Sequence, residues 1–239
     1  MAYQTTFERY EIKYLLTAQQ KEQLLRAMRG RMQLDQFGRS TIRNIYYDTD
    51  TFRLIRRSLE KPTYKEKLRI RSYRQVRPGD PVFVELKKKF QSIVYKRRLV
   101  LPEAQAMDSF RTGNALPVQS QIANEIEYFR AYYHTLRPAV FLSYEREAFY
   151  ALDGSDFRVT FDENIQYRCR DFSLGSAVYG TPLLAGGQTL MEIKTSGGMP
   201  LWMTHALTEN SIFHTSFSKY GAAYQHMLDT DFSGGLLYA

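Results

Sequence analysis

Charged and apolar side chains alternate along many short segments of this chain, a period of two that is typical of β-strands. Strands are predicted at residues 9–15, 42–47, 65–75, 82–89, 93–101, 139–150, 157–161 and 190–195. Apolar residues recur at helical spacing elsewhere, as at Ile122, Ile126 and Phe129, and Thr17 is a suitable N-cap. Helices are predicted at residues 18–28, 103–110, 118–133, 201–207 and 218–228. Because no repeats or long linkers interrupt this order, we expect one α+β domain over residues 1–239.

The charged face of these strands is mainly basic. Every odd position in the segment 65–71 is Lys or Arg, whereas Leu68 and Ile70 lie on the opposite face. One interpretation is an open sheet with its charged face in water. However, like charges on neighbouring strands repel one another, and solvated sheets usually mix both signs. We therefore expect a closed, mostly antiparallel β-tunnel with the basic face inside and helices packed outside.

Composition and charge narrow the class of partner. The 239 residues carry a net charge of +8, which favours polyanions such as nucleic acids, anionic membranes or phosphate-rich small molecules. A nucleic-acid binder would interleave exposed aromatic residues with basic ones, whereas the aromatic residues here mostly lie opposite the charges. We therefore expect no nucleic-acid partner. Cys169 is the single cysteine of the sequence, so no intrachain disulfide can form.

The sequence also predicts a cellular compartment. The N-terminal segment MAYQTTFERYEIKY lacks the apolar core of a signal peptide, and no apolar run approaches the ~20 residues of a spanning helix. We expect a cytoplasmic protein, which a membrane-protein partner could hold at the inner face of the membrane.

Several segments, in order along the chain, resemble the vacuolar transporter chaperone (VTC) domain, a polyphosphate polymerase module of the triphosphate tunnel metalloenzyme (CYTH-like) superfamily. They are RYEIKYLL at 9–16, IYYDT at 45–49, LEKPTYKEKLRIRSY at 59–73, VFVELKKK at 82–89, VYKRR at 94–98, SYERE at 143–147, FRVTFDENI at 157–165, LMEIKT at 190–195 and SFSKY at 216–220. The resemblance implies an eight-stranded tunnel that moves the terminal phosphoryl group of ATP onto a growing inorganic polyphosphate chain. It also implies a divalent metal, Mn²⁺ or Mg²⁺.

The same resemblance assigns roles to single residues. The basic residues expected to bind and stabilise the phosphoryl groups are Lys13, Arg69, Arg71, Lys87, Lys96, Arg146, Arg158 and Lys219. The further residues expected to bind substrate are Lys67, Arg98, Tyr144 and Ser218. Glu192 is implied as the metal ligand, with Glu11 beside it, and the alternative for each is an ion pair with a neighbouring lysine or arginine. A wall of this kind suits phosphoryl transfer, because Arg and Lys hold the substrate in line and stabilise charge on its oxygens.

Three positions depart from the family pattern and keep other functions open, and one of them is Ser58, where an arginine is expected. The first strand begins with Arg9 where relatives often have a glutamate, and Ser216 stands where some polymerases have a second lysine. One alternative is a tunnel triphosphatase that hydrolyses tripolyphosphate or a nucleotide, although such an enzyme is expected to have more acidic residues in its tunnel. Another alternative is a non-catalytic polyphosphate-binding subunit.

Further expectations concern Glu85, Asp48 and the last helix. Glu85 is interpreted as a structural ion-pair partner and Asp48 as a turn residue. Ser218 is a suitable N-cap, which would bring Lys219 and the helix N-terminus to one mouth of the tunnel. Because a lysine is unfavourable at that end of a helix, we expect the substrate anion to compensate its charge.

Overall fold

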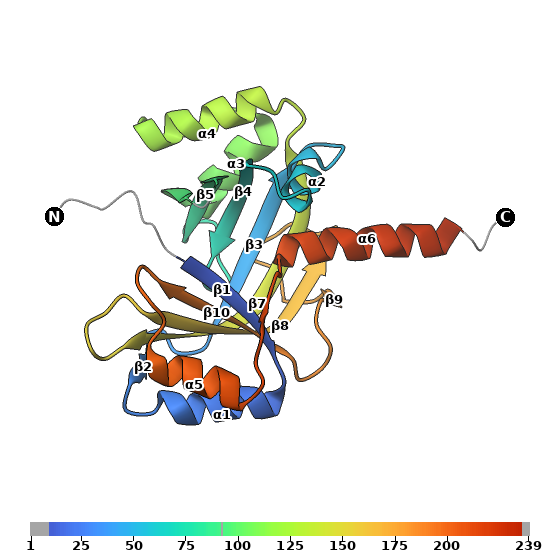
Figure 1. The fold of residues 1–239 in the computed structure, drawn as a ribbon. Coiled ribbons are helices and arrows are strands. Elements are labelled where there is room, and N and C mark those ends of the chain that lie inside the picture. The colour runs from blue at the N-terminus through green and yellow to red at the C-terminus, as the bar shows by residue number, and fades with distance from the viewer. Residues whose placement is uncertain (1–9, 92, 236–239) are drawn as a thin grey trace.

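The computed structural model describes residues 10–91 and 93–235, and its central feature is one antiparallel β-sheet (Figure 1). Eight long strands follow one another across the sheet in the order β1 (Tyr10–Leu16), β10 (Thr189–Thr195), β8 (Arg158–Arg168), β7 (Arg137–Ala151), β3 (Ser40–Asp48), β4 (Tyr64–Ser72), β5 (Pro81–Phe90) and β6 (Ile93–Pro102). Three short strands are added to this path, as β11 (His214–Thr215) pairs with β1, β2 (Met32–Leu34) with β7 and β9 (Thr181–Pro182) with β8. All eight predicted strands are present, and the predicted α+β class with an antiparallel sheet is confirmed.

The sheet curves strongly, so that the strands at its two ends face each other. Figure 1 shows β1 and β10 in the lower half of the sheet and β4 and β5 in the upper half. Lys87 on β5 reaches Glu11 on β1, with 3.7 Å between Nζ and Oε2. In the described part of the chain, no backbone ladder joins β6 to β1 or β11. The contact between Lys87 and Glu11 therefore spans the tunnel from β5 to β1, and strand pairing forms the wall from β1 round to β6.

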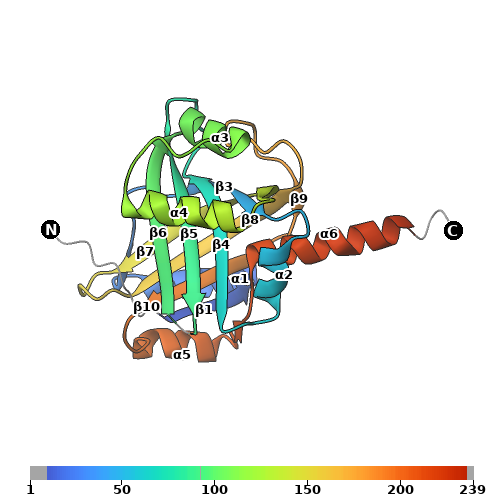
Figure 2. The same cartoon turned by 90° about the horizontal axis from the view of Figure 1, so that it is seen from above.

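Two pairs of helices cover the apolar outer face of the sheet. α3 (Glu103–Thr112) and α4 (Gln121–Tyr132) pack on β4, β5 and β6, and Figure 2 shows α4 lying across these three strands. α1 (Ala18–Met28) and α5 (Leu201–Glu209) cover β1, β10 and β8. The residues buried at the first contact include Leu68, Ile70, Val82, Val84, Ile126 and Phe129, and those at the second include Leu24, Val159, Phe161, Met191, Ile193 and Met203. The prediction of helices outside the tunnel is thus confirmed.

A helix that the pattern did not predict, α2 (Arg53–Leu59), is held by Asp48. The carboxylate of Asp48 is fully buried and accepts hydrogen bonds from the N–H groups of Leu54 and Ile55 and from the hydroxyl of Tyr220. Burial raises the pKa of this carboxyl group, and the hydrogen bonds oppose the rise. Asp48 is therefore a structural carboxylate that ties α2 to the C-terminal helix, rather than the simple turn residue that was expected.

The C-terminal helix α6 (Lys219–Gly235) begins between the two halves of the sheet and projects away from it (Figures 1 and 2). Tyr220 and Tyr224, near its start, are buried in a cluster with Ile42 and Tyr144 of the sheet. The start of α6 is therefore anchored inside the fold. Among residues 10–91 and 93–235, no helix is long and apolar enough to cross a membrane.

The remaining differences from prediction are the end of β8 and the short strands β2, β9 and β11, which were not predicted. β8 continues to Arg168, beyond the predicted end at 161, because an irregular pairing near Asn164, whose φ is +49°, breaks the alternation. β11 follows the segment 190–195, which was expected to be the last strand. Arg9, the first departure from the family pattern, lies outside the described residues.

Candidate functional site

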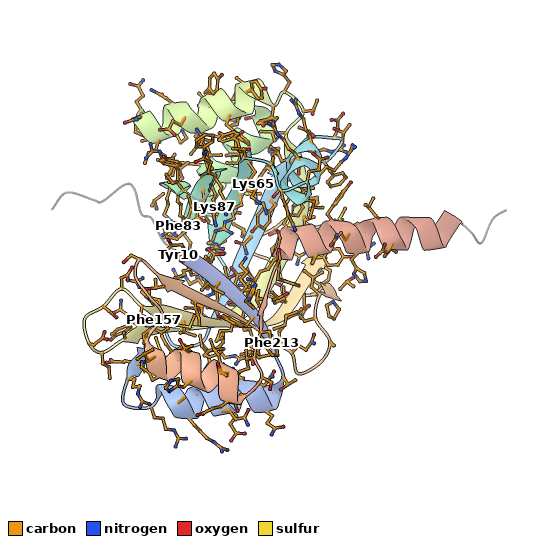
Figure 3. All side chains as sticks on the ribbon, viewed as in Figure 1. Tyr10, Lys65, Phe83, Lys87, Phe157 and Phe213 are labelled. Atoms are coloured by element: carbon orange, nitrogen blue, oxygen red, sulfur yellow. The ribbon has the colours of Figure 1, made fainter. Side chains whose placement is uncertain are left out.

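The inner face of the sheet carries basic side chains from neighbouring strands. Residues paired across strands share one face, and pairing aligns Lys67 of β4 with Lys87 of β5 and Lys96 of β6. Figure 3 shows Lys65 and Lys87 on the side of β4 and β5 that faces β1, away from α3 and α4. The strands supply to this face the basic residues Lys13, Lys65, Lys67, Arg69, Arg71, Lys87, Lys89, Lys96, Arg98, Arg146, Arg158 and Lys194 and the acidic residues Glu11, Glu85, Asp162 and Glu192. The face that alternation predicted to be basic therefore turns inward.

Two buried carboxylates gather cations in the lower half of the tunnel. Nζ of Lys219 lies 2.6 Å from Oδ2 of Asp162 and 3.1 Å from Oε1 of Glu192. The guanidinium group of Arg146 donates two hydrogen bonds of 2.6 Å to Asp162 and lies 3.5 Å from Glu192. Burial disfavours the ionised carboxylates, but Lys219 and the other cations outweigh it and lower the pKa of both acids. Burial likewise disfavours the charge of Lys219, and the two carboxylates reverse this and raise its pKa.

In the upper half of the tunnel, one buried carboxylate, Glu85, is likewise surrounded by cations. Its side chain is only 1% exposed and lies 2.7 Å from Arg69, 2.8 Å from Lys96 and 2.6 Å from Arg98. Burial opposes the charge of Glu85, but Arg69, Arg71 and Lys96 hold its pKa well below the usual range. Burial also lowers the pKa of Lys96 to about 8. The structural ion-pair role expected for Glu85 is confirmed.

Tyr144 joins the two clusters. Arg71 donates hydrogen bonds to the side-chain oxygen of Asn44, at 2.8 Å, and to the hydroxyl of Tyr144, at 2.9 Å. On the other side, Nζ of Lys219 lies 4.7 Å and the guanidinium carbon of Arg146 5.1 Å from the centre of the Tyr144 ring. Tyr144 thus fixes cations from β4, β7 and α6 around one aromatic ring.

The start of α6 lies among the lysines of the tunnel wall. Oγ of Ser218 accepts a hydrogen bond from the N–H of Gly221 at 3.1 Å, so Ser218 is the predicted N-cap. Nζ of Lys67 lies 3.1 Å from the same oxygen, and Lys13 donates to the carbonyl oxygen of Phe217 at 2.9 Å. Contrary to expectation, Lys219 is compensated here by protein carboxylates, so its charge does not need the substrate anion.

The structure brings together nearly all of the residues that the sequence pointed to. Those within the ion-paired and hydrogen-bonded network of the interior are Glu11, Lys13, Lys67, Arg69, Arg71, Lys87, Lys96, Arg98, Tyr144, Arg146, Glu192, Ser218 and Lys219. Arg158 is the exception, because it lies at the start of β8 and is exposed to solvent.

Sequence reasoning missed three residues of this interior. Asp162 shares a face with Arg158, which is the signal that could have identified it. Tyr46 accepts a hydrogen bond from Arg69 at 2.9 Å. Burial opposes ionisation of the Tyr46 hydroxyl, but the positive charges of Arg69, Arg71 and Lys67 outweigh burial and lower the pKa of Tyr46 to about 8. The buried hydroxyl of Thr160 has no hydrogen-bond partner among the described residues.

The described residues contain no group of three or more acidic, histidine or cysteine side chains that could hold a metal ion by themselves. Glu192 and Glu11 nevertheless both contact Nζ of Lys13, at 3.8 Å and 3.2 Å. Two such carboxylates fit a hard cation that takes its other ligands from water and phosphate oxygens. Glu192 forms ion pairs with Lys219 and Arg146, as expected if its role is ion pairing rather than metal binding. The role of Glu192 as a metal ligand stays a prediction.

Comparisons with known proteins agree with this geometry. The model of the VTC domain family matches residues 8–228. Among solved structures, a candidate adenylate cyclase from Bacillus halodurans has a TM-score of 0.55 and 14% identity, with 90% of this chain and 96% of that chain covered. A candidate adenylyl cyclase from Hippeastrum, described as having a dominant triphosphatase activity, has a TM-score of 0.58 and 14% identity, with coverage of 90% and 95%. These likenesses support the tunnel fold. No curated protein matches the sequence.

Proposed function

Because this chain belongs to the VTC domain family, we propose that it is a polyphosphate polymerase, which transfers the terminal phosphoryl group of ATP to a growing inorganic polyphosphate chain. The observation that carries the proposal is the basic inner face of the sheet, on which cations outnumber the carboxylates that neutralise them. A linear polyanion would complete this neutralisation along the length of the tunnel.

The arginines and lysines of the tunnel wall have different roles in the proposed reaction. Arg69, Arg71 and Arg98 can each bind two phosphate oxygens through the planar guanidinium group, whereas the lysines act as mobile point charges. Together they hold the attacking oxygen, the phosphorus and the leaving oxygen in line and stabilise charge on the equatorial oxygens. No general base is needed when the acceptor is a phosphate oxyanion.

The proposed reaction also uses a divalent cation, Mn²⁺ or Mg²⁺. Held by Glu192 with Glu11 beside it, it would supply charge neutralisation between phosphate oxygens. Before that cation and the substrate bind, Lys13 and Lys219 neutralise Glu192.

A tunnel triphosphatase is the second candidate, and two observations favour it. The dominant triphosphatase activity described for the Hippeastrum protein belongs to a structure with the same fold. In addition, Asp162 and Glu85 give this interior more acidic residues than the first-strand pattern suggested. A non-catalytic polyphosphate-binding subunit is a third candidate, since Ser216 is exposed and supplies no second lysine before α6.

The proposed partners are ATP and inorganic polyphosphate rather than nucleic acid. Many of the buried aromatic rings, such as Phe157 and Phe161, pack under the outer helices, where they cannot stack on bases. A membrane-protein partner that holds the protein at the cytoplasmic face of a membrane stays a prediction.

Incubation of the purified protein with ATP and Mn²⁺, with products resolved by size, tests the proposal. A ladder of polyphosphate is the expected result. Release of orthophosphate alone would support the triphosphatase, and binding of tripolyphosphate without turnover would support the binding subunit.

A further inference from the structure

A hydroxyl group and an amine meet inside the tunnel at Ser218 and Lys67. Nζ of Lys67, in the middle of β4, lies 3.1 Å from Oγ of Ser218, at the N-cap of α6. A serine hydroxyl beside a lysine amine is the arrangement of a nucleophile and its base, provided that the amine can lose its proton.

The surroundings of Lys67 favour the neutral amine. Burial is the main cause, and the charges of Lys87, Lys13 and Lys65 on β5, β1 and β4 act in the same direction. Tyr46 on β3 opposes them, and the net result lowers the pKa of Lys67 to about 8. In the ligand-free protein, a sizeable fraction of the Lys67 side chains is therefore neutral near that pH and can accept a proton.

The surroundings of Ser218 favour negative charge on its oxygen. The N–H of Gly221 in the first turn of α6 donates to Oγ at 3.1 Å. The N-terminus of a helix carries partial positive charge and is a suitable place for an alkoxide or a phosphate. Lys13 lies close by, because it donates to the carbonyl oxygen of Phe217.

We propose that Ser218 is a phosphoryl acceptor, which is phosphorylated by the nucleoside triphosphate bound in the tunnel with Lys67 as general base. This inference rests on the proposed function for its donor, a nucleoside triphosphate. Oγ of Ser218 attacks the γ-phosphorus, and an Oγ–P bond forms while the bond from that phosphorus to the β,γ-bridging oxygen breaks. The nucleoside diphosphate leaves, and the hydroxyl proton moves to Nζ of Lys67.

The product is a phosphate monoester in a place suited to hold it. Its oxygens lie at the N-terminus of α6, beside the newly protonated Lys67. A phosphoserine presents the same oxygens as the end of a polyphosphate chain, so it is a tethered first acceptor for chain growth.

The test uses ATP labelled at the γ-phosphate, the full chain and Mn²⁺, without added polyphosphate. We expect label on the protein, and mass spectrometry of its peptides should place one phosphoryl group on Ser218. Ser218→Ala should remove the label, and Ser216→Ala, which changes an exposed hydroxyl two residues earlier, should leave it unchanged.

Lys67→Arg keeps the positive charge and the N-cap but cannot act as a base near neutral pH. It should lower the labelling rate about a hundredfold, a typical contribution of a general base. At ATP concentrations well below saturation, where the rate reports the pKa of the ligand-free enzyme, the labelling rate of the wild-type protein should rise with pH up to about 8, and this rise should be absent in Lys67→Arg.

The outcomes separate this inference from the proposed function. Polyphosphate synthesis without label on Ser218, or label that persists in Ser218→Ala, would overturn the inference and leave the polymerase standing. Label on Ser218 in a protein that makes no polyphosphate would support the inference and count against the polymerase. Unchanged labelling in Lys67→Arg would remove Lys67 as the base.

Discussion

Nζ of Lys219 lies 2.6 Å from Oδ2 of Asp162, so α6 enters the tunnel with its charge already paired inside the protein. The side chain of Asp162 is fully buried and that of Lys219 is 10% exposed. The contact therefore links the last helix to β8 in a place where water cannot replace either partner.

Lys219→Ala should destabilise the ligand-free protein. Removal of Lys219 takes one of two cations from the buried Asp162 and leaves it with Arg146 alone. Loss of one member of a buried ion pair costs about 3–5 kcal/mol in other proteins, which sets the upper end of the expected loss. Denaturant unfolding of the ligand-free variant measures the loss. This expectation differs from the one drawn from the sequence, in which the substrate anion compensated the charge of Lys219.

Lys219→Arg is the control. It keeps a positive charge beside Asp162 and Glu192, so it should retain part of the stability that Lys219→Ala loses. If Lys219→Ala unfolds at the same denaturant concentration as the wild-type protein, the ion pair does not anchor α6.

The affinity for tripolyphosphate should fall as pH rises above about 8. Burial lowers the pKa of Lys67 from 10.5 to about 8, so this side chain loses its charge in the ligand-free protein over that range. Binding then requires uptake of a proton, and the loss approaches about tenfold per pH unit for each such group. Calorimetric titrations between pH 7 and pH 10 measure it, and Lys67→Arg, which stays charged, should show a shallower dependence.

Titration of Lys67 changes the stability of the ligand-free protein in the opposite direction from its effect on tripolyphosphate affinity. Between the lowered pKa of Lys67 and its ordinary value, the unfolded chain binds more protons than the folded one. The contribution of Lys67 to the free energy of unfolding of the ligand-free protein therefore rises with pH across this window. The measurement is the difference in the free energy of unfolding between the wild-type protein and Lys67→Arg. If the contribution of Lys67 falls as pH rises through this window, its pKa is not lowered by burial.

Glu192→Gln should abolish Mn²⁺-dependent turnover and leave tripolyphosphate binding in place. The amide keeps the size of the side chain but lacks the negative charge that a hard cation requires. Binding should even tighten, because Lys219, Lys194 and Arg146 lose their shared carboxylate. Turnover with Mn²⁺ at the wild-type rate would assign Glu192 to ion pairing alone.

The inner face was predictable because a strand converts sequence alternation directly into two faces. Lys67 and Arg69 show this, since each lies inside the tunnel as the pattern of segment 65–71 required. The role of Asp162 was not predictable in the same way. Its partner Lys219 comes from a distant helix, and no local pattern indicates where that helix enters the fold.

Helix α2 and strand β11 were missed because they lack the usual sequence signals. α2 begins after Phe52, which has a φ of +55° and provides no side-chain cap, so the usual start signal is absent. Asp48, four residues before Phe52, takes over that role, as its hydrogen bonds to Leu54 and Ile55 show. β11 is two residues long and is defined only by its pairing with β1.

Arg97 and Arg98 provide the most direct test that the inner wall binds polyphosphate. They are adjacent on β6 but point to opposite faces, since Arg98 contacts Glu85 inside the tunnel and Arg97 contacts Glu125 of α4 outside it. The measurement is the tripolyphosphate affinity of Arg98→Ala and Arg97→Ala by calorimetry. Arg98→Ala should weaken binding about tenfold or more, as expected for loss of a charge-assisted contact, and Arg97→Ala should bind like the wild-type protein. Equal affinities of the two variants, whether both weakened or both unchanged, would contradict the account.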